Sequence, residues 1–167
     1  MNTTLINTIR FIVFFALQIL IFNNLNLFGY LNPYPYILFI LLFPVNGNKL
    51  LLLISSFFLG LLLDVFENSD GVHAIASVTL AFVRPILFKF SFGLSYEYQT
   101  IRITEKIRSE LITLLFLSIL IHHFILFFFE IFRIDLILIV LKKTLYTTIF
   151  TFIISMLLIF LIKPNKR

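Results

Sequence analysis

The sequence LLLLISSFFLGLLLDVF, residues 50–66, decides the fold class of this chain. It is a predominantly apolar run, and a transmembrane helix needs about 17–25 such residues. The rest of the chain has the same character: 60% of its 167 residues are hydrophobic, 23 are Phe, and the mean hydropathy is +1.08. A soluble domain needs a charged shell, yet only 13% of the residues are charged. We therefore expect an all-α integral membrane protein with a single membrane domain over residues 1–167.

Apolar segments of similar length lie on both sides of this run, without the alternation of a membrane barrel. The second segment is too short for a full span, so we expect a half-membrane helix or a tilted helix shielded by protein. The buried part of the last segment is expected to begin near Thr144, because two lysines precede that residue. The polar stretch 93–110 is a candidate surface helix. The six segments are 5–22, 36–45, 50–66, 72–92, 111–129 and one within 136–162.

The loop charges predict the orientation of this bundle of about six transmembrane helices. With a cytoplasmic N-terminus, most basic residues near span ends fall inside, as the positive-inside rule requires. The same rule accounts for the net charge of +5, so we expect no nucleic-acid partner. We expect a multi-pass protein of the cell inner (cytoplasmic) membrane with both termini cytoplasmic. The inside residues are Lys49, Lys89, Arg102, Lys106, Arg108, Lys163, Lys166 and Arg167; the acidic outside residues are Glu67, Asp70, Glu130 and Asp135.

A stripe of small residues marks the third segment, where Ser56, Gly60 and Asp64 share one helix face. Small residues allow another helix to approach closely. Two interpretations of Asp64 stay open: it contacts an ion or a partner, or it is an interfacial carboxylate that bonds or caps the following loop.

The fourth segment places Ser77, Ala81 and Arg84 on one face, followed by Pro85. Arg84 either extends to the membrane surface beside Lys89 or points inward to a carboxylate or a helix C-terminus. A direct pair with the carboxylate of the third segment is not expected, because the two residues lie at different depths.

His122 and His123 are adjacent on the fifth segment, so they point to different faces of one helix. This arrangement does not predict a metal site, which needs three or four converging ligands. We expect these rings to form hydrogen bonds between helices and to join an outer polar patch. Its candidates are His73, His122, His123, Glu130 and Lys143.

A hydroxyl stripe on the sixth segment has two interpretations, close helix packing or the lining of a substrate path. Its members are Thr144, Thr148, Thr151 and Ser155. Nucleotide-binding loops, nucleophile elbows and paired-carboxylate motifs are all missing from the sequence. We therefore expect no enzymatic activity, no cofactor and no catalytic residue.

Several short motifs together resemble the MreD family, the rod shape-determining membrane proteins of bacteria. The spacing of Gly60, Asp64 and Gly71, followed by the pair Arg84-Pro85, carries most of this resemblance. The matching stretches are Asn32-Pro33, 36–44, FLGLLLD at 58–64, GVHA at 71–74 and AFVRP at 81–85.

The resemblance implies a non-enzymatic scaffold subunit of the cell-elongation complex. The implied partners are an MreC-like protein, the MreB filament (directly or through other subunits), a RodA-type glycosyltransferase with its transpeptidase, and membrane lipid. MreD-like proteins are also similar in fold to the S-components of energy-coupling-factor transporters. The alternative function is therefore a substrate-binding S-component for a vitamin or a metal, with the polar-patch residues as ligands.

Overall fold

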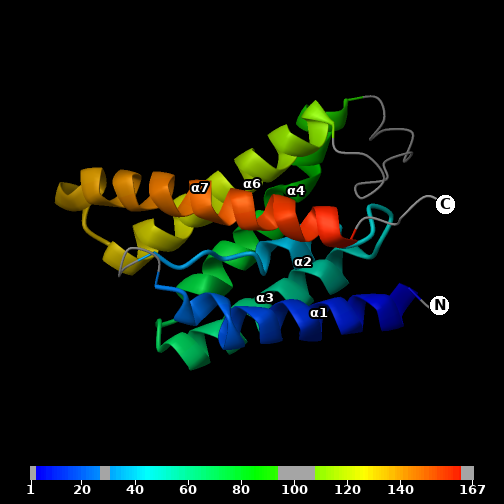
Figure 1. The fold of residues 1–167 in the computed structure, drawn as a ribbon, viewed down its shortest axis with the longest axis horizontal. Helices are drawn as coiled ribbons and strands as arrows, with labels where there is room; N and C mark the ends of the chain where they lie inside the picture. Colours follow the sequence, from blue (N-terminus) through cyan, green and yellow to red (C-terminus); the bar gives the residue numbers. More distant parts are fainter. Residues whose placement is uncertain (1–2, 27–30, 94–107, 163–167) are drawn as a thin grey trace.

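The computed structural model describes residues 3–26, 31–93 and 108–162, and within these ranges the chain is organised as helices (Figure 1). The elements are α1 (Thr3–Leu20), η1 (Phe22–Asn24), α2 (Ile37–Leu42), α3 (Lys49–Glu67), α4 (Val72–Phe92), α6 (Ser109–Ile131), η2 (Ile134–Leu136) and α7 (Ile137–Ile162). The expected all-α class is confirmed.

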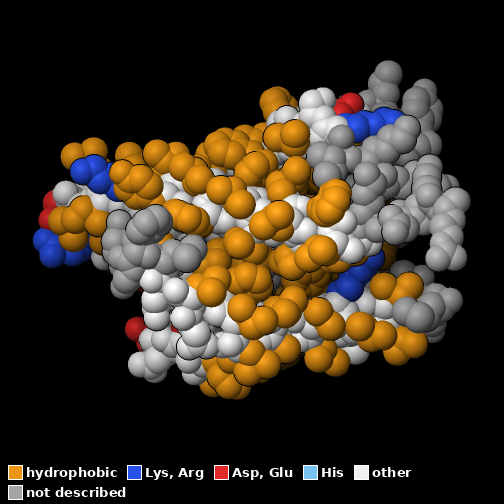
Figure 2. Space-filling model, viewed as in Figure 1, with side chains coloured by type: hydrophobic (Ala, Val, Ile, Leu, Met, Phe, Trp, Pro, Cys, Tyr) orange, Lys and Arg blue, Asp and Glu red, His pale blue; other side chains and the backbone are white. Residues whose placement is uncertain are grey.

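Five helices of the described ranges are long and apolar enough to cross a membrane. They contain α1, α3, α4, α6 and α7, and their outward side chains include Phe82 at 72% and Leu20 at 73% exposure. Figure 2 shows the broad middle of the molecule covered by hydrophobic side chains, with charged ones mostly toward its two ends. Such a surface is suited to lipid rather than to water. The chain is therefore a multi-pass membrane protein.

The centre of the bundle is occupied by the interrupted segment 31–43, an extended stretch followed by α2. It runs between the long helices from one end of the bundle to the other (Figure 1). Every residue of α2 is at most 6% exposed, so the short helix is surrounded by protein. The prediction of a short second helix shielded by protein is confirmed.

Local turn chemistry explains where α3 and α4 begin and end. The Asn48 side chain accepts hydrogen bonds from the first amides of α3, those of Leu50 and Leu51. Asn68 ends α3 in the left-handed conformation at φ 54°, and Gly71 precedes α4 at φ 89°. Asn and Gly are the residues that adopt this backbone conformation most readily. The result is a tight hairpin of two membrane-length helices.

The α3–α4 hairpin and the α6–α7 connection lie at the same end of the bundle, and the first turn of α1 and the last turn of α7 lie at the opposite end (Figure 1). We call the former the acidic end, because it carries Glu67, Asp70, Glu130 and Asp135.

One expectation about the chain is corrected, and another concerns residues outside the described ranges. Packing of α7 against α6 begins about one turn before Thr144, since Val140 is already 1% exposed. The candidate surface helix at 93–110 lies almost wholly outside the described residues. So do the basic residues Arg102, Lys106, Lys163, Lys166 and Arg167.

Candidate functional site

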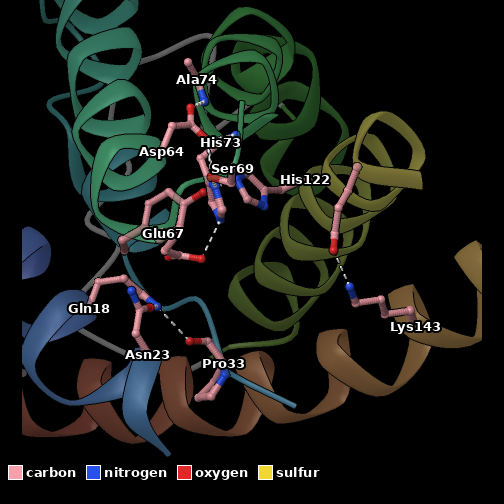
Figure 3. A network of polar contacts seen from close by, with 12 residues as sticks. Gln18, Asn23, Pro33, Asp64, Glu67, Ser69, His73, Ala74, His122 and Lys143 are labelled. Carbon is pink, nitrogen blue, oxygen red and sulfur yellow. Dashed lines mark hydrogen bonds and ion pairs between the residues drawn. The ribbon is translucent and has the colours of Figure 1, made fainter. Parts of the chain in front are cut away.

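Asp64 on α3 caps the neighbouring helix α4. Its Oδ1 accepts hydrogen bonds from the amide of His73 at 2.9 Å and the hydroxyl of Ser69 at 2.7 Å. Its Oδ2 accepts from the amide of Ala74 at 2.9 Å (Figure 3). The first amides of a helix have no partner within that helix, and a carboxylate also suits its positive dipole end. Of the two interpretations, the structure therefore places Asp64 in a capping role.

The small-residue stripe allows the α3–α4 approach. A Cβ placed on Gly60 would lie 2.5 Å from both the Ala74 Cα and the His73 carbonyl oxygen. Ser56 and Asp64 on the same face are also buried, at 0% and 5% exposure. This face therefore packs against α4 of the same chain.

Two arginines from different helices cap the C-terminal end of α2. Arg84 of α4 donates through Nη2 to the carbonyl oxygen of Leu41 at 3.3 Å and to that of Phe43. Arg10 of α1 donates through Nη1 to the carbonyl oxygen of Leu42 at 2.7 Å. A guanidinium satisfies exposed carbonyls and complements the negative dipole end of a helix. Arg84 therefore points inward, and the carbonyls that it meets belong to α2.

The separate depths of Asp64 and Arg84 agree with the expectation that they form no pair. Arg84 is 5% exposed on the same α4 face as Ser77 and Ala81, at 0% and 4%. Pro85 follows inside the helix. Through Arg84, this face holds the C-terminal end of α2.

The extended part of the central segment is held by side chains from α1 and α7. The Gln18 amide donates to the carbonyl oxygen of Pro33 at 3.1 Å and to Oδ1 of Asn23 at 2.7 Å (Figure 3). The Thr151 hydroxyl accepts from the amide of Tyr34 at 3.0 Å. Non-helical backbone is tolerated at membrane depth only where protein satisfies its polar groups. The contact of Thr151 favours packing over a substrate path for the hydroxyl stripe.

We expect Thr151→Val to lower the free energy of unfolding by about 1–2 kcal/mol, because the Tyr34 amide would lose its acceptor without loss of volume. Thr113→Val is the matched control, since that hydroxyl donates to the Ser109 carbonyl within its own helix. Titration with sodium dodecyl sulfate in mixed micelles measures both. Equal effects of the two substitutions would contradict this role of Thr151.

The two histidines of α6 lie inside the bundle. His122 Nε2 and the Tyr36 hydroxyl are 2.8 Å apart, and His123 Nδ1 and the Thr148 hydroxyl are 3.2 Å apart. Both rings are fully buried. The expected bonding between helices is thus seen for His123 and, through the central segment, for His122. The two rings therefore contribute no exposed surface to the outer polar patch.

Two tyrosine rings connect these histidines to His73. The Tyr34 ring lies 5.5 Å from that of His73 and 5.6 Å from that of His123. The Tyr36 ring lies 6.1 Å from that of His73 and 5.3 Å from that of His122. Lys143 of α7 and Glu130 of α6 form an ion pair at 2.7 Å, with side chains 34% and 41% exposed. An exposed pair of this kind contributes little stability. His73 and Glu130 both line a pocket at the acidic end.

That pocket, which we call the Glu67 pocket, has a volume of about 330 Å³. Leu126 and Phe129 of α6 supply part of its apolar wall. Inside it, His73 Nε2 lies 3.4 Å from Glu67 Oε2, while His73 Nδ1 lies 3.0 Å from Asp64 Oδ1 (Figure 3). Its polar lining includes Tyr34, Glu67, Ser69, Asp70, His73 and Glu130.

A second pocket of about 320 Å³ lies near the first turns of α1 and α3. Its wall combines the rings of Phe11, Phe39 and Phe43 with the side chain of Asn7. This wall is mostly apolar and suits a lipid chain or another hydrophobic group.

Sequence reasoning missed Gln18, Arg10 and Tyr34 as functional positions in the interior. A lone amide or guanidinium within an apolar span was the available signal, since such groups need partners at membrane depth.

Among the described residues, no group of three or more His, Asp or Glu side chains is placed to hold a metal ion.

Comparisons of the chain with protein-family models, with curated proteins and with solved structures find no match. The fold and the polar contacts therefore carry the functional argument.

Proposed function

We propose that this chain is a non-enzymatic scaffold subunit of the bacterial cell-elongation complex, as its resemblance to MreD implies. It would serve cell shape and lateral wall synthesis from the cytoplasmic membrane. Its partners would be an MreC-like protein and a RodA-type glycosyltransferase with its transpeptidase, and its link to MreB could be indirect.

In this proposal the chain crosses the membrane six times, with both termini in the cytoplasm. The central segment 31–43 supplies the second crossing, and the acidic end faces outward. The positive-inside rule supports this orientation, because Lys49 and Lys89 lie toward the end opposite Glu67 and Asp70.

The observation that carries the proposal is that polar side chains of several helices bond to the central segment of the chain itself. Arg84 caps α2, Thr151 holds the central segment, and His122 bonds Tyr36. An interior whose polar groups serve the fold is typical of a packed structural bundle. Partners would then meet the broad apolar outer surface, where membrane helices associate by close packing.

Photocrosslinking in native membranes tests this proposal. Benzoylphenylalanine would replace Phe58, Phe82 or Phe160, which are 53%, 72% and 63% exposed, and Phe127, at 1%, as the buried control. We expect adducts with an MreC-like protein or a wall synthase from at least one exposed position and none from Phe127. Adducts with transporter ATPases and their coupling subunit alone, or with no wall-synthesis protein, would refute the scaffold.

The Glu67 pocket favours a second candidate function, a small-molecule-binding subunit similar to an S-component. Its volume lies at the lower limit of ligand pockets, which enclose about 300–1,000 Å³. Of the ligands expected for that function, His73 and Glu130 line the pocket, whereas His122, His123 and Lys143 are not among its lining residues. Copurification of a small molecule that is lost on Glu67→Gln would support this candidate.

A further inference from the structure

The Glu67 pocket is lined by more acidic than basic side chains. Glu67, Asp70 and Glu130 line it, and among the described residues Lys143 is the only lysine or arginine paired with any of them. The potential inside a concave site with excess carboxylates is negative, which favours a cation.

The ring of His73 lies between two carboxylates. Its Nδ1 lies 3.0 Å from Asp64 Oδ1, and its Nε2 lies 3.4 Å from Glu67 Oε2. In the neutral tautomer that donates from Nδ1 to Asp64, the Nε2 lone pair is directed toward Glu67. The side chain of His73 is 3% exposed, and neither its Nε2 nor Oε1 of Glu67 has a hydrogen-bond partner among the described residues. Buried acceptors without a donor are costly, so they indicate a ligand that supplies N–H groups.

The volume and the aromatic rings of the pocket indicate which kind of cation it can bind. Among the described residues, no three acidic or histidine side chains are placed to hold a metal ion. The pocket volume of about 330 Å³ is also larger than a bare ion requires. The ring of Tyr34 lies 5.5 Å from that of His73, and Phe129 lines the opposite helix wall. Aromatic rings attract organic cations through their π faces and pack against attached carbon atoms.

We propose that the Glu67 pocket binds a small organic cation with a primary ammonium group, which donates to the Glu67 carboxylate and to Nε2 of His73. The three N–H donors of this group match the buried acceptors, while a quaternary ammonium has none. The same group occurs in free amines and in the aminoethyl headgroup of a phospholipid. The inference gives the second candidate function its ligand class and does not depend on the scaffold proposal.

Isothermal titration of the full-length protein in dodecyl maltoside tests it. The probes are ethanolamine and dihexanoyl phosphatidylethanolamine, with choline and dihexanoyl phosphatidylcholine as their quaternary counterparts. We expect saturable binding of at least one primary ammonium probe, at least tenfold tighter than that of its counterpart. Tighter binding of the free amine or of the phospholipid identifies the source of the ligand.

Two variants and a control tie the binding to this pocket. Glu67→Gln and Tyr34→Leu are each expected to weaken binding at least tenfold, while Asp135→Asn, an exposed residue paired with Arg133 outside the pocket, leaves it unchanged. The proposal is overturned if neither primary ammonium probe binds the folded protein, if the counterparts bind equally well, or if folded Glu67→Gln binds as the wild type does. These binding results do not affect the photocrosslinking result, so the ligand proposal and the scaffold proposal are tested independently.

Discussion

Replacing Arg84 by Met is expected to lower the free energy of unfolding by about 3–5 kcal/mol, because a charged donor is lost while its acceptors stay buried. The carbonyl oxygens of Leu41 and Phe43 would then face apolar side chains at the end of a fully buried helix. Lipid cannot replace the missing donor. Arg84→Lys is expected to restore only part of the loss, because a single ammonium does not reproduce the fork of the guanidinium.

Titration with sodium dodecyl sulfate in mixed micelles measures this effect. Lys142→Met is the matched control, since it removes a basic side chain that is exposed on α7. We expect the control to change the free energy of unfolding by less than about 0.5 kcal/mol. A folded Arg84→Met protein as stable as the Lys142→Met protein would show that the cap on α2 is unimportant.

Gly60→Leu is expected to be the other severe substitution, with a loss of about 3 kcal/mol or more. Already the first carbon of the new side chain would lie 2.5 Å from the Ala74 Cα and the His73 carbonyl oxygen. These are backbone atoms of α4, so they cannot move aside as a flexible side chain can. Separation of the helices would also pull the α4 amides away from Asp64.

Val65→Leu is the control on the same helix, because Val65 is 71% exposed on the outer surface. The melting temperatures of the two detergent-solubilised variants, followed by size-exclusion chromatography after heating, give the comparison. We expect a large decrease for Gly60→Leu and almost none for Val65→Leu. A Gly60→Leu protein with the same melting temperature as the wild type would disprove the close α3–α4 contact.

The long helices could be predicted because a membrane span requires one continuous apolar run, and polar breaks mark its ends. The short second helix followed from the same length argument, since residues 36–45 cannot cross as a regular helix. The contacts of Arg84 could not be predicted in this way. Its acceptors are the carbonyl oxygens of residues 41 and 43. Every residue has a backbone carbonyl, so the sequence does not indicate which of them accept a hydrogen bond.

The burial of the histidines could not be predicted for a related reason. Lipid tails and a protein interior are similarly apolar, so the hydrophobic pattern of a span does not reveal which face is inward. The sequence therefore does not reveal that both His122 and His123 are fully buried. Gln18 was missed because its partner, the carbonyl of Pro33, becomes available only where the central segment is extended.

Single-cysteine labelling tests most directly whether the central segment crosses the membrane, and the absence of native Cys makes each label unambiguous. Leu25→Cys and Asn46→Cys lie at exposed positions before and after segment 31–43, and Phe39→Cys is the buried control. With a membrane-impermeant maleimide, we expect Leu25→Cys to react in intact spheroplasts, Asn46→Cys to react only after lysis, and Phe39→Cys to stay unlabelled. Reaction of Leu25→Cys and Asn46→Cys from the same side would contradict the account, because the segment would then enter and leave at one membrane surface.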